Sequence, residues 1–147
     1  MRKELDQLDR TILACLSRDA RMSWTDLASE AGVSSPTIRD RVQRLQDIGI
    51  IQGFAVELST AALGYSLEAI VRFRPLPGKR HALERQIQET DRIVQCDKVT
   101  GDDGFVARIV LKSIGELDPL LETFGRMATT STSVVKSSPV RMRPPPF

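Results

Sequence analysis

The feature that most constrains the fold is a pair of short apolar-periodic segments joined by Ala31-Gly32-Val33. In the first segment, apolar residues recur three and four positions apart, which predicts one face of a helix. These residues are Trp24, Leu27, Ala28 and Ala31. Ser23, with Asp26 three residues later, predicts the N-terminal cap of this helix. Gly32 supplies the backbone freedom that a sharp turn between two helices requires.

A second helix is predicted to begin at Ser34-Ser35-Pro36, because serine caps helices well and proline is tolerated in the first turn. Its buried stripe is predicted to be Ile38, Val42 and Leu45. Two helices joined by a turn with glycine, with arginines on the second helix, are typical of a helix-turn-helix that binds double-stranded DNA. The alternative is a solvated charged helix in a small bundle.

Candidate DNA-binding residues lie beside this buried stripe. At about 100° per residue, Thr37, Arg41 and Arg44 fall on one flank of the second helix, and Arg39 and Gln43 fall on the other. Arginine suits both flanks, because its planar group pairs with phosphate or with the two acceptors of guanine. The predicted DNA-binding residues are Ser34, Ser35, Thr37, Arg39, Arg41, Gln43 and Arg44.

Charge within residues 1–53 is balanced, and the whole chain carries a net charge of only +2. We expect Asp40 to pair with Arg44 one turn later, or to accept a hydrogen bond from a cytosine amino group. Since phosphate neutralisation dominates nonspecific DNA binding, one copy should attract DNA only modestly. The balance therefore predicts that several copies act together.

The remaining composition indicates a cytoplasmic protein without a cofactor or metal. No apolar run approaches the ~20 residues of a membrane span, and the charged start MRKELDQLDR is not typical of a signal peptide. Cys15 and Cys96 match no metal-ligand spacing, so we expect free thiols in a reducing compartment. The single histidine, His81, is expected to be a solvated side chain on a polar helix.

A first helix is predicted over residues 7–18, with Asp6 and Asp9 as its N-terminal capping residues. Its apolar stripe is predicted to be Leu8, Ile12, Cys15 and Leu16. Three helices in about 50 residues are typical of a compact DNA-binding unit. Trp24 is expected to pack in its core, because a lone aromatic residue on an apolar stripe usually packs. An extended strand is expected at 54–58.

The pattern after Gly64 predicts a second, mixed domain. Its elements are strands at 67–74, 93–100, 105–111 and 132–140, with helices at 79–89 and from Leu117 to Ala128. This order, βαββαβ, is typical of a ferredoxin-like α+β sandwich. We expect the two helices to leave part of the apolar sheet surface uncovered, which predicts an obligate dimer. The apolar faces in question are Leu67, Ala69, Val71 and Phe73 with Phe105, Ala107, Ile109 and Leu111.

The chain resembles the leucine-responsive regulator (Lrp/AsnC) family in short stretches that follow the family's order. They are Leu8-Asp9, Ile12-Leu13, Asp19-Ala20-Arg21-Met22-Ser23, Leu27-Ala28, Gly32-Val33-Ser34, Arg41-Val42, Arg44-Leu45, Gly49-Ile50-Ile51, Gly53-Phe54 and Val99-Thr100-Gly101. The resemblance divides the chain into a helix-turn-helix domain (1–53), a linker strand and connector (54–64), a βαββαβ domain (65–140) and a Pro-rich tail (141–147).

The resemblance implies a transcriptional regulator that dimerises through the linker strand and the βαββαβ domain and assembles further into tetramers or octamers. It also implies a small-molecule effector, commonly an amino acid, bound between dimers. The effector-lining residues that it implies are Thr100, Gly101, Asp102, Asp103, Ser131, Thr132 and Ser133. This chain has Gly104-Phe105 where many relatives have an acidic residue before the aromatic one, so Asp102 or Asp103 would have to hold a ligand amino group.

Two alternatives to this interpretation stay open. The hydroxyl-rich run 129–133 is equally well explained as a polar entry to an edge strand. Some relatives with the same two-domain plan are siroheme decarboxylases, which resemble enzymes with histidines at the tetrapyrrole site. His81 alone, outside the predicted strands, does not match that pattern.

Overall fold

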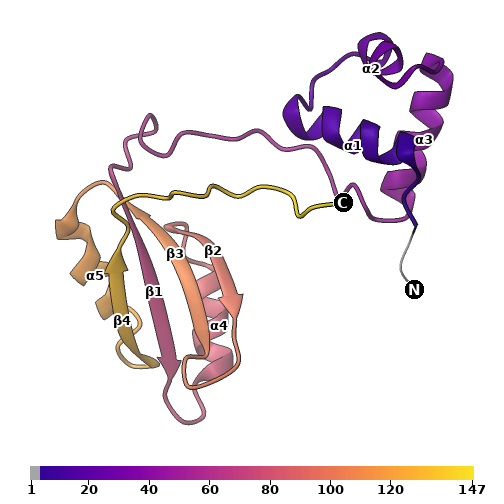
Figure 1. The fold of residues 1–147 in the computed structure, drawn as a ribbon. Helices are drawn as coiled ribbons and strands as arrows, with labels where there is room; N and C mark the ends of the chain where they lie inside the picture. The colour runs from indigo at the N-terminus through magenta and orange to yellow at the C-terminus, as the bar shows by residue number, and fades with distance from the viewer. Residues whose placement is uncertain (1–3) are drawn as a thin grey trace. The chain divides into compact units, whose positions relative to one another are not determined.

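A computed structural model describes residues 4–147, which form two compact units (Figure 1). The first unit comprises the residues up to Glu57 together with Val140–Phe147. The second unit comprises Leu58–Pro139. Among the described residues, no helix is long and apolar enough to cross a membrane.

Three helices build the first unit, which is therefore the helical unit: α1 (Gln7–Arg18), α2 (Trp24–Ala31) and α3 (Ser35–Asp47). Their caps confirm the predicted ones. The Asp6 side chain accepts a hydrogen bond from the Asp9 backbone N–H at 2.8 Å, and the Asp9 side chain accepts one from the Asp6 N–H at 3.2 Å. Ser23 and Ser34 accept in the same way from the third residue of their helices. Gly32 ends α2 with a φ of 66°, which favours glycine.

The core of this unit forms where the three helices meet. Its buried apolar residues are Ile12, Leu13, Cys15, Leu27, Ala28, Ile38, Val42 and Leu45. The predicted stripe of α1 is partly wrong, because Leu8 and Leu16 are only half-buried while Leu13 and Asp9 are buried. The prediction that Trp24 packs in the core is also wrong. Trp24 is the first residue of α2 and remains 39% exposed, since α2 contributes Leu27 and Ala28 to the core.

The strand expected at 54–58 does not form in the single chain. A strand requires a neighbouring backbone with which to exchange hydrogen bonds, and no described segment of this chain pairs with these residues. Phe54, Val56 and Leu58 are exposed. The segment therefore carries three apolar side chains at alternate positions without cover.

The second unit has the predicted βαββαβ order. Its elements are β1 (Leu67–Pro75), α4 (Arg80–Gln88), β2 (Ile93–Lys98), β3 (Phe105–Leu111), a short 3-10 helix η1 (Ile114–Glu116), α5 (Leu117–Glu122) and β4 (Ala128–Val134). The strands are antiparallel in the order β2-β3-β1-β4, so β2 and β4 are the edges of the sheet (Figure 1).

The last two elements differ from the sequence prediction. The helix ends at Glu122 rather than near Ala128, and the last strand spans 128–134 rather than 132–140. Ala128 and Phe124 are both buried in the core, but Phe124 reaches it from the turn after α5 and Ala128 from β4. Helical spacing of apolar residues therefore continued past the true helix end. Pairing with β1 begins at Ala128 opposite Pro75, which places the hydroxyl-rich run inside the strand.

One face of the sheet carries the core. Ala69, Val71 and Phe73 of β1 pack with α4 and with Phe124, whose ring meets Phe73 edge-on at 4.9 Å between centroids. The predicted alternation is confirmed, but the argument for a dimer from these residues is wrong. The two apolar faces are covered within the single chain, apart from the half-buried Leu67. The opposite face carries charge, including an ion pair of Glu68 and Arg108 at 2.8 Å.

Candidate nucleic-acid interface and ligand segments

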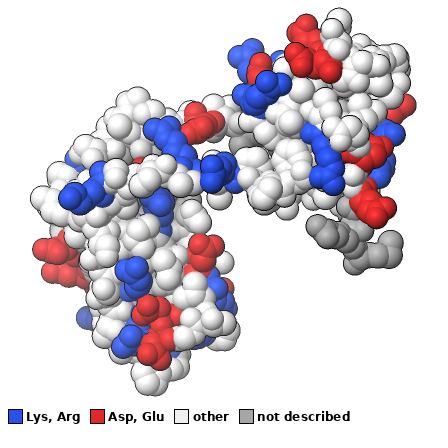
Figure 2. All heavy atoms as spheres, viewed as in Figure 1, with Lys and Arg blue, Asp and Glu red and all other residues white. Residues whose placement is uncertain are grey.

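The outward side of α3 is the candidate nucleic-acid interface. Ile38, Val42 and Leu45 are buried as predicted, which orients the rest of the helix. Arg39, Asp40 and Gln43 are exposed on the side away from this stripe. Figure 2 shows basic and acidic side chains intermixed on the viewed face of the helical unit, as its balanced sequence charge implies. On this viewed face, neither sign of charge forms a continuous surface.

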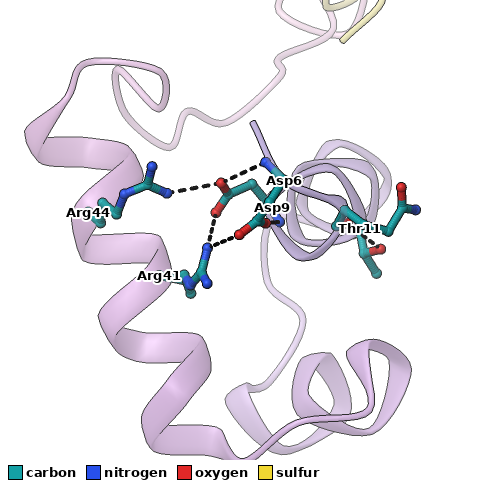
Figure 3. A network of polar contacts seen from close by, with 6 residues as sticks. Asp6, Asp9, Thr11, Arg41 and Arg44 are labelled. Carbon is teal, nitrogen blue, oxygen red and sulfur yellow. Dashed lines mark hydrogen bonds and ion pairs between the residues drawn. The ribbon is translucent and has the colours of Figure 1, made fainter. Parts of the chain in front are cut away.

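One predicted flank of α3 faces α1 (Figure 3). Arg41 and Arg44 point toward the start of α1, where Asp6 and Asp9 lie. Nη1 of Arg41 contacts Asp6 Oδ2 and lies 3.2 Å from Asp9 Oδ1. Nη1 of Arg44 lies 2.9 Å from Asp9 Oδ2. The expectation that Arg44 pairs with Asp40 is wrong, because the capping carboxylates of α1 lie beside this flank.

Asp9 is the centre of these contacts and the buried charged residue of the core. Its side chain is 0% exposed, whereas those of Arg41 and Arg44 are 33% and 46% exposed. The hydrogen bond from the Asp9 backbone, and then that from Arg41, hold the pKa of Asp6 below its ordinary value. The Asp6 carboxylate in turn raises the pKa of Arg41. The sequence marked both aspartates as capping residues, but nothing local in it indicated their partners.

The other flank of α3 is exposed. Arg39 has no hydrogen bond or ion pair to any described residue, while Gln43 donates to Asp47 at 2.8 Å. At the start of the helix, the hydroxyls of Ser34 and Thr37 share a hydrogen bond of 2.8 Å. The Ser35 hydroxyl donates to the Trp24 carbonyl at 3.4 Å. The predicted DNA-binding arginines therefore differ: Arg41 and Arg44 contact carboxylates of α1, whereas Arg39 is exposed without a partner among the described residues.

The first implied ligand segment is the turn between β2 and β3. The Val99 N–H donates to the Gly104 carbonyl at 3.1 Å, and the Gly104 N–H donates to the Phe73 carbonyl at 2.9 Å. Asp103 lies 3.6 Å from the Arg74 guanidinium, whereas Thr100, Gly101 and Asp102 are exposed. The turn is thus attached to the end of β1, with its middle directed to solvent.

The second implied ligand segment lies in β4, and its three hydroxyls do not share one face. Ser131 pairs with Arg72 and Ser133 with Ile70, on the open side of the sheet, whereas Thr132 pairs with Val71 on the helix-covered side. Within one chain, the three hydroxyls that the resemblance implies are therefore divided between two faces of the sheet. Side chains alternate along a strand, so the side chains of the two serines lie on the open face and that of Thr132 does not.

The two implied segments are also staggered along the sheet. Arg74, which contacts the turn, pairs with Thr129. Ser133 pairs with Ile70, four residues earlier in β1, which corresponds to roughly 13 Å along the strand. The structure thus places Thr129 nearer the turn than Ser133. The sequence analysis included Thr129 in the hydroxyl-rich run 129–133 but not among the effector-lining residues, and it placed the start of the strand at residue 132.

Other candidate chemistry is absent from the described residues. No three side chains among His, Cys, Asp and Glu come together as metal ligands there. Cys15 is buried and Cys96 is half-buried, and burial raises the pKa of the Cys96 thiol. His81 is exposed on α4 rather than on the sheet. No observation favours the tetrapyrrole enzyme.

Both halves of the chain match known families. The AsnC-type helix-turn-helix domain matches residues 5–46, and the Lrp/AsnC ligand binding domain matches residues 68–145. The HTH-type transcriptional regulator LrpA of Mycobacterium tuberculosis is 28% identical over 141 residues, covering 93% of this chain and 94% of LrpA.

Solved structures share the fold. The structure of LrpC from B. subtilis matches with a TM-score of 0.87 at 26% identity, covering 92% of this chain and 97% of that one. A transcriptional regulator from Neisseria meningitidis, solved as a complex with L-Met, matches with a TM-score of 0.85 at 18% identity. That match covers 95% of this chain and 94% of the other.

Proposed function

Because this chain belongs to the Lrp/AsnC family of transcriptional regulators, we propose that it reads specific DNA sites with the Arg39 side of α3. The observation that carries this proposal is the contrast among the arginines of that helix. Arg41 and Arg44 are held by α1, while Arg39 is exposed and unpaired within the described residues. An unpaired guanidinium can donate two of its N–H groups to the O6 and N7 acceptors of guanine.

Gln43 is proposed to read a base beside Arg39, because the two are one turn apart on the same exposed side. Its amide donates to Asp47, so binding would exchange that contact for one to adenine. Ser34, Ser35 and Thr37 lie at the N-terminus of α3, where hydroxyls and backbone N–H groups suit a phosphate. These three would fix the register of the helix rather than read bases.

Several copies are proposed to act together as a homodimer that assembles further to a tetramer or octamer. The first support is the balanced charge of the helical unit, which limits what one copy contributes to DNA affinity. The second is the uncovered segment 54–58, whose backbone lacks a partner within the described chain. Pairing of this segment with its copy in a second chain would satisfy the backbone and cover Phe54, Val56 and Leu58.

The second unit is proposed to bind a small carboxylate-bearing effector, most simply an amino acid. Support comes from its match to a ligand-binding domain and from the neisserial regulator of the same fold, which was solved with L-Met. We place the effector against Thr100, Gly101, Asp102 and Asp103 of the turn, with Ser131 and Ser133 supplied from the open side of the sheet. The stagger between these segments is consistent with contributions from different subunits.

A regulator that works on chromosomal DNA is expected in the cytoplasm. The test of DNA binding begins with footprinting on the upstream region of the protein's own gene and on neighbouring genes. Arg39→Ala should then weaken binding to the protected site by about 1–3 kcal/mol and relax specificity at one base pair. Arg126→Ala is the matched control, because it removes the same charge from an exposed position in the second unit. Equal binding by wild type and Arg39→Ala would exclude Arg39 as the base-reading residue.

A further inference from the structure

We infer that Asp9 is a positioning residue for DNA binding: it holds Arg41 and Arg44 so that their free edges contact the phosphate backbone. This inference rests on the proposed function of α3. Asp9 itself would not touch DNA, since its side chain is 0% exposed. It would act through the two arginines, which lie nearly one turn apart on the reading helix.

The contacts use both oxygens of one buried carboxylate. Asp9 Oδ1 accepts from Arg41 at 3.2 Å, and Oδ2 accepts from Arg44 at 2.9 Å and from the Asp6 backbone N–H at 3.2 Å. Asp6 adds a second contact to Arg41. A single side chain on α1 therefore connects the helix start to two points on α3 (Figure 3).

The two arginines keep capacity for a second partner. A guanidinium group has five N–H donors. The contacts to Asp6 and Asp9 involve only Nη1 of each arginine, and the side chains are still 33% and 46% exposed. An arginine already held by a carboxylate loses less conformational freedom when it binds a phosphate than a free one does. The structure thus offers two pre-oriented donors beside the exposed side of α3.

Charge alone predicts the opposite effect of Asp9 on DNA, which makes the inference testable. A carboxylate beside the reading helix repels phosphate, so its simple neutralisation should strengthen binding. If Asp9 positions the arginines, its neutralisation should weaken binding in spite of the added positive charge. The sign of the change in affinity therefore separates the two effects.

The experiment measures the affinity of full-length Asp9→Asn for the footprinted site at several salt concentrations, below the temperature at which its circular dichroism departs from wild type. We expect at least a tenfold loss for both the site and scrambled DNA, and a salt slope lower by about one to two per subunit. Glu30→Gln is the matched control, because it removes one exposed carboxylate from α2 of the same unit. It should bind DNA as tightly as wild type or more tightly.

Arg44→Lys keeps the experiment decisive if Asp9→Asn does not fold. The Arg44 side chain is partly exposed. A lysine at this position keeps the charge but lacks the planar fork that can hold a carboxylate and a phosphate together, so we expect a severalfold loss of affinity for DNA. Wild-type affinity in Arg44→Lys, or unchanged or tighter binding by a folded Asp9→Asn, would overturn the inference alone. Failure of the wild-type protein to bind any DNA would overturn the proposed function as well.

Discussion

Pro75 occupies the space that a side chain at position 104 would need. A Cβ built on Gly104 would lie 2.7 Å from both Cγ and Cδ of Pro75, closer than real Cβ contacts come. Gly104 is buried, and its N–H donates to Phe73 two residues before Pro75. The glycine that departs from the family pattern is therefore required by the end of β1. An acidic side chain for a ligand amino group has no room at this position.

The contact with Pro75 predicts that Gly104→Ala destabilises the second unit. Inserting a methyl group into a packed site should lower the free energy of unfolding by about 1–3 kcal/mol. Urea denaturation of the full chain would measure this. Gly115→Ala is the control, since the nearest atom to its Cβ would be the Ser113 hydroxyl at 3.7 Å. Equal destabilisation by the two variants would contradict the role of Pro75.

The burial of Leu45 predicts that its truncation destabilises the helical unit. Its side chain is fully buried where α3 meets α1 and α2, so Leu45→Ala should lower the free energy of unfolding by ~2–5 kcal/mol. Gln46→Ala, at an exposed position of the same helix, provides the comparison. Chemical denaturation followed by circular dichroism distinguishes them. A loss below about 0.5 kcal/mol, the scale of an ordinary surface substitution, would mean that the core relaxes into the cavity.

The lowered pKa of Asp6 predicts that the helical unit loses stability in acid. Its pKa is lowered in the folded state by the Asp9 backbone and by Arg41. The stability that it contributes is therefore fully present above its unfolded pKa, near 3.8, and is lost as the pH falls through the lower native value. Asp6→Asn should lose less stability than wild type over this range, as measured by melting temperature against pH. Parallel curves for the two proteins would contradict this expectation.

The register of β4 predicts which hydroxyls contact an effector. A ligand found by thermal-shift screening of amino acids and 2-oxo acids should add about 2.7 kcal/mol at a hundredfold its dissociation constant. Ser133→Ala and Asp102→Ala should weaken its binding, whereas Thr132→Ser should not, because Thr132 lies on the helix-covered side. Titration calorimetry measures the three affinities. Unchanged affinity in the first two variants would place the site elsewhere.

The uncovered linker predicts the state of assembly. Val56 is 82% exposed in the single chain, so Val56→Asp should leave each unit folded while disfavouring strand pairing between chains. Light scattering at micromolar concentration should give at least the mass of a dimer for wild type and a smaller mass for the variant. A wild-type mass of 16.4 kDa, that of one chain, would refute the dimer.

Much of the fold could be predicted because it depends on neighbours in sequence. Ser23, Ser34 and Gly32 act within four residues of the helix ends that they define, and the alternation of Ala69, Val71 and Phe73 places them on one face by strand geometry alone. The buried stripe of α3 followed from helical periodicity in the same way. Family resemblance then extended these local predictions to the DNA-binding and ligand-binding classes.

What the sequence alone determined is thus most of the elements and their order, the caps of the three N-terminal helices and the family. Tertiary structure decided the roles of individual side chains. Arg41 and Arg44 turn to Asp9, 32 and 35 residues away, and Trp24 stays exposed at the start of its helix. The start of β4 was set by pairing with β1, and the space at Gly104 by Pro75. Each of these outcomes depends on groups that only folding brings together, so no periodicity along the chain could carry the information.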